Sequence, residues 1–283
     1  MAALRLERIE SLDDPRVALY RNLKDGDLRR RDGLFMAEGR FVVETLIEHS
    51  RFRADSILLT PAVWSQLEPL CERLGLESPI YLAEQEVLDE VVGLNLHRGC
   101  LAVGRVGSVL APAELLKEPI REPSTLVVLE GLTNTENVGT VFRNAIAFAV
   151  DGVVLCPRCA DPLYRRSIRV SMGGSLRVPF ARASAWPEAL DELRSADYQV
   201  LALDPGPRSI ELHELPPEVV QSDRVAWLLG TEGKGLSEES LERADWKVRI
   251  PMVSDVDSVN VGTASGIAFH YLYSRRRDGE CGG

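Results

Sequence analysis

The sequence lacks the features that mark secreted, membrane-spanning and disulfide-stapled proteins. Its first ten residues carry charges at Arg5, Glu7, Arg8 and Glu10 and hold no apolar stretch, so they predict no signal peptide. The longest uncharged stretch around an apolar run, residues 258–274, contains several polar side chains and is a poor membrane span. Five cysteines are an odd number and predict no disulfide framework. We therefore expect a cytoplasmic protein with no membrane partner.

Lysine is also scarce, and acidic residues outnumber basic ones. Only four of the 33 basic residues are lysines, and the formal net charge is −10. An acidic balance argues against a nucleic-acid partner, because phosphates repel it. The arginines nevertheless gather in residues 16–31 and 158–182. A GC-rich genome explains a preference for arginine but not this clustering, and arginine binds phosphate through paired hydrogen bonds. The candidate RNA contacts are Arg29, Arg30, Arg31, Arg165, Arg166 and Arg169.

Two runs of alternating strands and helices predict an α/β protein with two domains. In the first run, an apolar helical stripe covers residues 34–50. This run predicts a small α/β domain over residues 1–107, with a basic arm at its start. Prolines and charges in residues 108–124 indicate a linker. The other expected strands are residues 56–60, 79–83 and 99–106, and the other expected helices are 61–75 and 84–93.

The second run predicts a larger domain over residues 125–274, followed by a frayed tail at 275–283. Its strands are apolar almost throughout, which is typical of a parallel sheet covered on both faces. The expected strands are residues 125–131, 152–156, 176–182, 198–204, 224–230 and 246–252. The expected helices are residues 138–150, 163–174, 186–196, 237–244 and 258–273.

Two polar loops follow strands in this larger domain, where open α/β sheets place their ligands. Residues 132–145 contain Asn137 and Arg143. Arg143 lies one helical turn after Gly139 and could reach back to the loop; the alternative is that it is a solvated residue on the helix surface. Residues 228–239 hold three glycines but do not match a phosphate-binding loop, and Glu232 would repel phosphates. A neutral or cationic adenosine-type ligand fits this loop better, with a plain glycine-rich connector as the alternative.

A third segment, residues 250–272, combines a capped helix start with many small residues. Asn260 in its first turn can offer an amide to a ligand, although tight core packing also accounts for the small residues. Cys156 and Cys159 form a C-x-x-C at the end of a strand, so they have neither the further ligands of a zinc site nor the helix start of a thioredoxin-type pair. The four histidines form no metal-spaced pair, and we expect no metal.

The three segments in this order, NVGTVFRNA, LLGTEGKGLS and IPMVSDVDSVNVGTASGIAF, resemble the SpoU family of the SPOUT class. Members are S-adenosylmethionine-dependent RNA ribose 2′-O-methyltransferases. The resemblance implies a methyltransferase domain with a deep trefoil knot, an N-terminal domain similar to ribosomal protein L30e, and a homodimer. Ribosomal RNA, most of all 23S rRNA, is the implied substrate, and the likeness is strongest to the rRNA methyltransferases of actinomycetes that confer antibiotic resistance.

The resemblance also implies roles for individual residues. The catalytic set is Asn137, Arg143, Glu232, Ser258 and Asn260, with Arg143 orienting the ribose and phosphate. The cofactor is expected against Leu229, Gly230, Thr231, Gly235, Ile250, Met252, Val259 and Asn260. The chain departs from the family pattern at Asn134 and Thr135, where Asp-Pro is common, at Gly262, where serine is common, and around residues 270–272, where a glutamate is often found. A tRNA-modifying enzyme and a catalytically silent RNA-binding protein are the alternatives.

Overall fold

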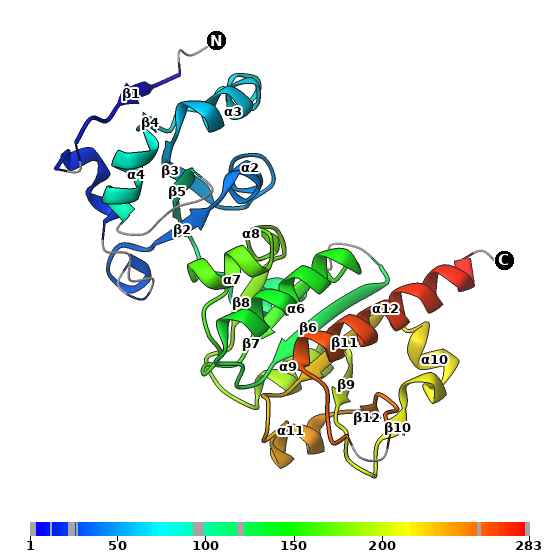
Figure 1. Cartoon of the computed structure of the whole chain (residues 1–283). Helices are drawn as coiled ribbons and strands as arrows, with labels where there is room; N and C mark the ends of the chain where they lie inside the picture. Colours follow the sequence, from blue (N-terminus) through cyan, green and yellow to red (C-terminus); the bar gives the residue numbers. More distant parts are fainter. Residues whose placement is uncertain are drawn as a thin grey trace. The chain divides into compact units, whose positions relative to one another are not determined.

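The computed structural model describes residues 4–11, 13–21, 26, 28–92, 99–117, 122–253 and 256–280. The chain forms two compact units, each with its own sheet (Figure 1). Unit 1 consists of Met1–Ser108 and Pro162–Arg177, and unit 2 consists of Val109–Asp161 and Val178–Gly283. The smaller domain predicted over residues 1–107 therefore also takes up a short segment from the second half of the chain. Among the described residues, no helix is long and apolar enough to cross a membrane.

Unit 1 has a five-stranded mixed sheet, which confirms the predicted α/β class. Its strands lie in the order β1 (Leu6–Arg8), β4 (Ile80–Leu82), β3 (Arg53–Leu59), β5 (Cys100–Arg105) and β2 (Leu34–Glu38). The first three are parallel, and β5 runs antiparallel to both β3 and β2. The helices are α2 (Arg40–Glu48), α3 (Pro61–Leu74), α4 (Gln85–Val92), α7 (Arg165–Val170) and α8 (Gly174–Arg177), with short helical turns at Pro15–Tyr20 and Leu28–Asp32.

Helix α3 shows how local chemistry sets the ends of an element. The Thr60 side chain accepts a hydrogen bond from the Val63 backbone, and Pro61 occupies the first turn, where its missing N–H costs nothing. Gly75 ends the helix with φ 59°, a left-handed conformation that glycine adopts without strain. The prediction of a helix over residues 61–75 is therefore confirmed.

The prediction of one helix over residues 34–50 is wrong in its first half. Residues 34–38 form strand β2, which pairs with β5 and is buried over four consecutive apolar residues. Gly39, at φ 96°, then turns the chain into α2. Helix α2 buries Val42, Val43 and Leu46, while Phe41 is 58% exposed. A fully buried strand has no alternation to distinguish it from helix, so periodicity alone merged the two elements.

Unit 2 is built on a seven-stranded sheet in which every strand pair is parallel, as the apolar strands predict. The strands lie in the order β10 (Ile210–Glu211), β12 (Trp246–Arg249), β9 (Gln199–Leu203), β11 (Arg224–Leu229), β6 (Ser124–Leu129), β7 (Gly152–Leu155) and β8 (Phe180–Arg182). Strands β6 and β11 lie at the middle of the sheet and are buried almost throughout.

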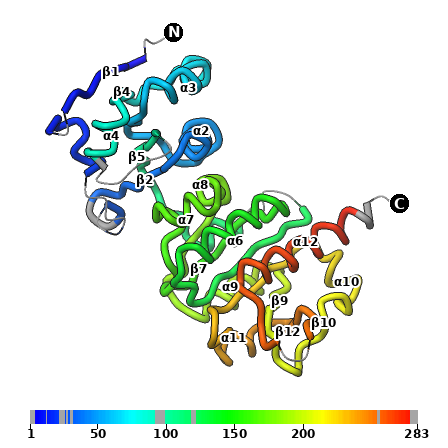
Figure 2. The backbone as a smooth tube through the Cα atoms, in the orientation of Figure 1, coloured from blue at the N-terminus to red at the C-terminus, as the bar shows by residue number. Residues whose placement is uncertain are grey.

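Helices cover this sheet on both faces, as expected for a parallel sheet. On one face, leucines of α5 (Pro112–Lys117), α9 (Ala189–Ser195) and α11 (Glu238–Arg243) join strand side chains in one apolar cluster. On the other face, α6 (Thr135–Ala147) packs along α12 (Val261–Glu280), and α10 (Pro217–Val220) contacts α12. Figure 2 shows the red α12 lying beside the green α6, far apart in the sequence. The knot implied by the resemblance stays a prediction.

Other segments also differ from their predicted structure. The helix expected over residues 163–174 is shorter, since α7 ends at Val170 and a turn precedes α8. Residues 108–124, expected as a linker, contain α5, which buries Leu115 and Leu116 in the core of unit 2. The strand expected at 176–182 begins only at Phe180, after helix α8. The tail does not fray at 275–280 but continues α12, while residues 281–283 lie outside the described residues. Arg276 anchors this extension by donating to Val220 O at 3.0 Å, Thr125 Oγ1 at 2.8 Å and Ser222 O at 2.6 Å.

Candidate active site

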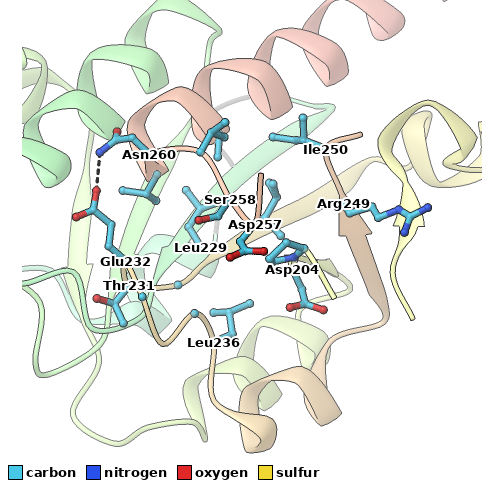
Figure 3. A pocket seen from close by; sticks show the side chains of 18 of the residues that line it. Asp204, Leu229, Thr231, Glu232, Leu236, Arg249, Ile250, Asp257, Ser258 and Asn260 are labelled. Carbon is cyan, nitrogen blue, oxygen red and sulfur yellow. Dashed lines mark hydrogen bonds between the residues drawn. The ribbon is translucent and has the colours of Figure 1, made fainter. Parts of the chain in front are cut away.

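A cavity of about 560 Å³ opens in unit 2 where the central parallel strands end (Figure 3). Its walls include Leu203, Leu229 and Arg249, the last residues of β9, β11 and β12. Parallel strands bring their carboxyl ends to one edge of a sheet, where ligands of open α/β sheets bind. The volume is within the usual range for small-molecule sites.

The structure brings most of the predicted site residues to this cavity. All eight residues expected against the cofactor line it, namely Leu229, Gly230, Thr231, Gly235, Ile250, Met252, Val259 and Asn260. Of the predicted catalytic residues, Glu232, Ser258 and Asn260 also line it. Asn137 does not line the cavity but reaches it through a hydrogen bond to Asn260.

Asn260 joins the three sequence segments at a single side chain. Its amide Nδ2 donates to Glu232 Oε1 at 2.5 Å and to Asn137 Oδ1 at 3.1 Å. Its Oδ1 accepts the backbone N–H of Gly262 at 2.8 Å and so caps the start of α12. Because a backbone N–H needs an acceptor, this cap fixes the orientation of the amide and leaves its two N–H groups for the two acceptors. Figure 3 shows the contact with Glu232 as a dashed line.

Asn137 is positioned by the start of helix α6. The Asn134 side chain accepts from Glu136 N at 2.8 Å and caps the helix, which begins at Thr135, three residues before the predicted start. Asn137 therefore lies in the first helical turn and is only 8% exposed. Its side chain is held where it can accept from Asn260. The Asn134–Thr135 departure from the family pattern thus still supplies a helix cap.

The glycine-rich loop forms a cavity wall through close backbone packing. A Cβ on Gly230 would lie 2.5 Å from the Gly235 backbone, so only glycine fits there. Gly233 and Gly235 have φ 85° and 67°, and Gly235 N donates to Thr231 O at 3.0 Å. The loop thus turns back on itself, and it is part of the cavity wall as well as a connector.

The charges around the cavity suit a cationic ligand. Asp204, Glu232 and Asp257 line it, against Lys234 and Arg249. Arg249 is already paired with the carboxylate of Glu211, at 2.8 Å from Nη2 to Oε1. Carboxylates in a partly enclosed wall attract positive charge and repel phosphate groups. The cavity therefore favours a ligand with a positive centre over a nucleoside triphosphate.

Four of these charged residues, Asp204, Lys234, Arg249 and Asp257, were not among the predicted site residues. Asp204 directly follows β9, which lies next to β11 in the sheet. The two strands are separated in sequence by a short strand and two short helical segments, so their adjacency is a property of the sheet order. A polar residue directly after an apolar strand was the available signal for Asp204.

Arg143 stands apart from the other predicted catalytic residues. It is exposed on α6 and does not belong to the cavity lining as the structure describes it. Its neighbour Asn144 faces α12, donating to Gly262 O at 2.7 Å and Ser265 Oγ at 2.9 Å. Thr140, one turn earlier, lies against Gly262 on the same side. Arg143 therefore does not take part in the packing of α6 against α12. Within a single chain it does not join Glu232 at the cavity.

The predicted RNA-binding arginines have different surroundings in unit 1. Arg165 and Arg169, on α7, both pair with Glu38 at the end of β2, at 3.8 and 3.3 Å. Arg166, between them, is exposed. Arg29 lies in the turn Leu28–Asp32, whereas the side chains of Arg30 and Arg31 lie outside the described part of the structure. Of the α7 arginines, Arg166 is exposed, whereas Arg165 and Arg169 are half-buried.

Comparison with known proteins gives the family. Residues 124–270 match the SpoU rRNA Methylase family. The chain belongs to this family. An uncharacterised tRNA/rRNA methyltransferase of Mycobacterium tuberculosis is 40% identical over 273 residues, covering 94% of this chain and 90% of that protein. The 23S rRNA (guanosine-2′-O-)-methyltransferase RlmB of Bordetella pertussis is 29% identical over 194 residues, or 69% of this chain and 77% of RlmB.

Solved structures share the fold over nearly the whole chain. An AdoMet-bound rRNA methyltransferase from Sinorhizobium meliloti superposes with a TM-score of 0.80 at 24% identity, covering 97% of this chain and 98% of that one. The SpoU methyltransferase AviRb from Streptomyces viridochromogenes gives 0.75 at 20% identity, covering 92% and 96%. These identities establish the α/β fold alone. By its family the chain is an RNA methyltransferase. The relatives described above do not identify it as a particular resistance enzyme.

Proposed function

We propose that this SpoU family member transfers a methyl group from S-adenosylmethionine to a ribose 2′-hydroxyl of ribosomal RNA, with 23S rRNA as the substrate. The observation that carries the proposal is the Asn260 side chain, which joins Asn137, Glu232 and the start of α12 at the cavity. The similarity to RlmB, named as a 23S rRNA 2′-O-methyltransferase, supports the same reaction. The amide–carboxylate arrangement gives each of the three family motifs a place in one site.

The volume and the charges of the cavity support S-adenosylmethionine as its ligand. Apolar side chains of Leu229, Ile250 and Val259 would hold its adenosine portion, and the carboxylates nearby suit its positive charge. A Cβ on Gly230 would meet the backbone of Gly235, so this glycine lets the loop fold closely on itself and form the cavity wall. When bound, S-adenosylmethionine supplies a methyl group activated by the positive sulfonium.

The chain's own residues would act by positioning. Asn260 holds the Glu232 carboxylate in one orientation, so the glycine-rich loop keeps a fixed shape at the cavity rim. Arg143 is exposed and would bind the incoming ribose and its phosphate; a guanidinium donates hydrogen bonds and accepts none, so it would orient the hydroxyl. Holding the two reacting groups in contact supplies much of the rate.

Incubation with methyl-labelled S-adenosylmethionine and separate 23S rRNA, 16S rRNA and tRNA tests the proposal. We expect label in 23S rRNA, at a nucleotide that stops reverse transcription at low dNTP concentration as a 2′-O-methyl group does. Label in tRNA alone would favour the tRNA-modifying alternative. Cofactor-independent RNA binding with no label in any RNA would instead favour a silent RNA-binding protein and overturn the proposal.

Three further parts of the proposal have their own tests. We expect a homodimer, which sedimentation velocity distinguishes from a monomer by mass.

We expect the enzyme to act in the cytoplasm, which fractionation of its host cells checks. Protection against a ribosome-targeting antibiotic is expected only if the methylated nucleotide lies at a drug site, and deletion of the gene should then lower the inhibitory concentration of that drug.

A further inference from the structure

The C-x-x-C turn after β7 brings two buried thiols together. The sulfur atoms of Cys156 and Cys159 lie 3.7 Å apart, and the residues are 0% and 7% exposed. Cys156 Sγ accepts the backbone N–H of Gly131 at 3.1 Å, and Cys159 Sγ donates to Leu129 O at 3.1 Å. Both sulfur atoms are therefore hydrogen-bonded to backbone groups at the end of β6 or in the loop that follows it.

The turn itself is held in place by one arginine. Arg182 Nη1 donates to the carbonyl oxygens of Cys156, Pro157 and Cys159 at 3.1, 3.2 and 2.8 Å. Cys159 N also donates to Cys156 O at 3.2 Å. A disulfide needs about 2.05 Å between its sulfur atoms. Because the two side chains already face each other on a fixed turn, small side-chain rotations can bring them to that distance.

The same turn contacts two of the loops that form the active site. Gly131, the donor to Cys156, begins the loop between β6 and α6, which leads to the helix cap Asn134 and to Asn137 in the first turn of α6. Glu130, the preceding residue, is 3% exposed and accepts from Ser237 N, at the end of the glycine-rich loop, at 3.3 Å. Arg158, inside the C-x-x-C, lies 3.9 Å from the same carboxylate. A change at the cysteines can thus reach both loops through one or two contacts.

We propose that Cys156 and Cys159 are a redox-active dithiol that a small hydroperoxide oxidises to a disulfide, with a loss of methyl transfer. The formation of the disulfide concerns the thiols alone, whereas the loss of methyl transfer rests on the proposed function. The proposal is supported by the short distance between the two sulfur atoms, by the fixed turn and by the contacts of the turn to the loops of the site. Sequence spacing argued against a redox pair because no helix starts at Cys156; the structure supplies the N–H of Gly131 in its place.

The thiol chemistry has a ready nucleophile. The neighbouring Cys159 thiol and the N–H of Gly131 lower the pKa of Cys156 despite its burial, and the same pairing with Cys156, together with burial, raises the pKa of Cys159. Cys156 is then the thiolate and Cys159 keeps its proton. Since the thiolate is the reactive form, Cys156 is the atom that attacks the oxidant.

The oxidation balances with hydrogen peroxide as the oxidant. The Cys156 thiolate attacks one peroxide oxygen, the O–O bond breaks, and the sulfur becomes a sulfenic acid while the released hydroxide takes up a proton as water. Cys159 sulfur then attacks the Cys156 sulfur, and the departing hydroxide leaves as a second water with the Cys159 proton. Both sulfur atoms are buried, so a water-sized hydroperoxide suits the site better than a bulky disulfide.

Oxidation would loosen the loop between β6 and α6. A disulfide sulfur carries no charge and is a weaker acceptor than a thiolate, so the hydrogen bond from Gly131 N to Cys156 Sγ becomes much weaker. Leu129 O loses its hydrogen bond from Cys159 at the same time. We expect the loop to shift together with the first turn of α6, which carries Asn137. This weakens the contact to Asn260 and slows methyl transfer about 10-fold, since small misplacements in an active site are costly.

Peptide mapping of the wild-type chain tests the thiol chemistry without any RNA. Trypsin cleaves after Arg143, Arg158 and Arg165, which separates the two cysteines onto neighbouring peptides. After hydrogen peroxide and thiol blocking, we expect those peptides joined by a reducible disulfide. The oxidation rate should persist well below the ordinary thiol pKa of about 8.5. Two separate peptides with unmodified thiols, or oxidation only at other cysteines, would overturn the proposal.

Activity of the same samples tests the coupling. We expect methyl transfer to fall about 10-fold on oxidation and to return with dithiothreitol, while Cys156→Ser and Cys159→Ser remain insensitive to mild peroxide. Cys156→Ala is a second variant in case the serine disturbs the turn. A disulfide that leaves the activity unchanged would overturn the coupling. An enzyme inactive even when reduced refutes the proposed function instead, and binding of labelled cofactor to oxidised and reduced protein then replaces turnover as the readout.

Discussion

Single side chains carry the organisation of this site, and Asn260 is the clearest case. A residue with two N–H donors and one acceptor satisfies two oxygen atoms and one backbone N–H at once. No carboxylate or hydroxyl can make the same set of contacts. The side chain therefore sets the relative positions of a helix start, a loop carboxylate and the partner helix α6.

Replacing Asn260 with aspartate separates these contacts. Asn260→Asp keeps an oxygen for Gly262 N but places a second carboxylate against Glu232, 2.5 Å from the present amide nitrogen. We expect turnover to fall about 100-fold. Repulsion raises the pKa of one carboxyl of this new pair, so activity should partly recover as the pH falls and a shared proton restores the contact.

The control for this variant is Asn260→Ala, which also removes the helix cap. We expect it to lower the free energy of unfolding by about 1 kcal/mol more than the aspartate variant does. Urea titrations measure the stability, and a pH profile of turnover measures the recovery. An aspartate variant with wild-type turnover at neutral pH would contradict the positioning of Glu232 by Asn260.

The glycine-rich loop gives a second comparison between residues. Gly230→Ala would place a Cβ 2.5 Å from backbone atoms of Gly235, whereas Gly233→Ala meets nothing within 4 Å and adds only the strain of φ +85°. We expect cofactor affinity to fall by more than about 10-fold in the first variant and by much less in the second, with an unfolding cost of about 1 kcal/mol for the strain. Calorimetric titration with S-adenosylmethionine distinguishes them.

Arg143 is separated from the cavity, so its variant tests a role in handling RNA. For Arg143→Ala we expect turnover to fall at least about 100-fold, on the scale of a group that takes part in positioning a proton transfer. Cofactor affinity should change little, because Arg143 does not line the cavity as described. Single-turnover rates and calorimetry separate the two effects. Wild-type turnover would remove Arg143 from the catalytic set.

At the scale of elements, the pairing of α6 with α12 holds the site together. Asn144 bonds to Gly262 O and Ser265 Oγ, and small residues on α12 allow the two helices to approach closely. The two residues of the Asn137–Asn260 contact lie at the starts of these two helices. The many small residues of the third segment therefore serve packing, and the polar side chain at its start serves the site.

The two glycines of α12 that face α6 allow this packing to be measured. A Cβ on Gly262 would lie 2.5 Å from Thr140 Cγ2, whereas a Cβ on Gly266 would meet Asn144 at an ordinary 3.4 Å. We expect Gly262→Ala to destabilise the fold by about 1–3 kcal/mol through overpacking. Gly266→Ala should be neutral or stabilising by up to about 1 kcal/mol, because alanine favours helix. Urea unfolding measures both, and Thr140→Ser should partly rescue Gly262→Ala.

Element prediction from sequence succeeded where caps and breakers mark the ends, as at Thr60, Pro61 and Gly75 around α3. It failed at residues 34–38, where a strand buried on both faces shows no alternation. It also failed at 275–280, where three acceptors far away in sequence hold Arg276 and extend α12. The charged sequence of residues 275–280 suggested fraying because these distant acceptors cannot be recognised from the sequence.

At the scale of the whole molecule, the distribution of charge decides how RNA could be bound. The net charge is −10, yet arginines gather in two stretches of the sequence. Within unit 1, Glu38 neutralises part of one stretch by pairing with Arg165 and Arg169. Affinity for RNA should therefore depend on a few exposed cations rather than on a broad basic surface.

Arg166→Ala tests this view. Because Arg166 is exposed on α7, we expect RNA affinity to fall a few-fold and the slope of log affinity against log salt to decrease by about 1, as for the loss of one phosphate contact. Arg194→Ala is the matched control, since Arg194 is an exposed arginine of unit 2 outside the two arginine-rich stretches. Equal effects of the two variants on RNA affinity would contradict a specific role of α7.

The sequence by itself determined the α/β class, most element positions and the residue types of the site, because caps, apolar runs and the three motifs are local in the chain. It also pointed to Asn137, Glu232 and Asn260 as separate members of a set. Only the tertiary structure decided that one amide joins them, that Asp204 lies at the same cavity, and that Arg143 does not. These facts depend on strand order and helix packing, which bring together segments more than a hundred residues apart.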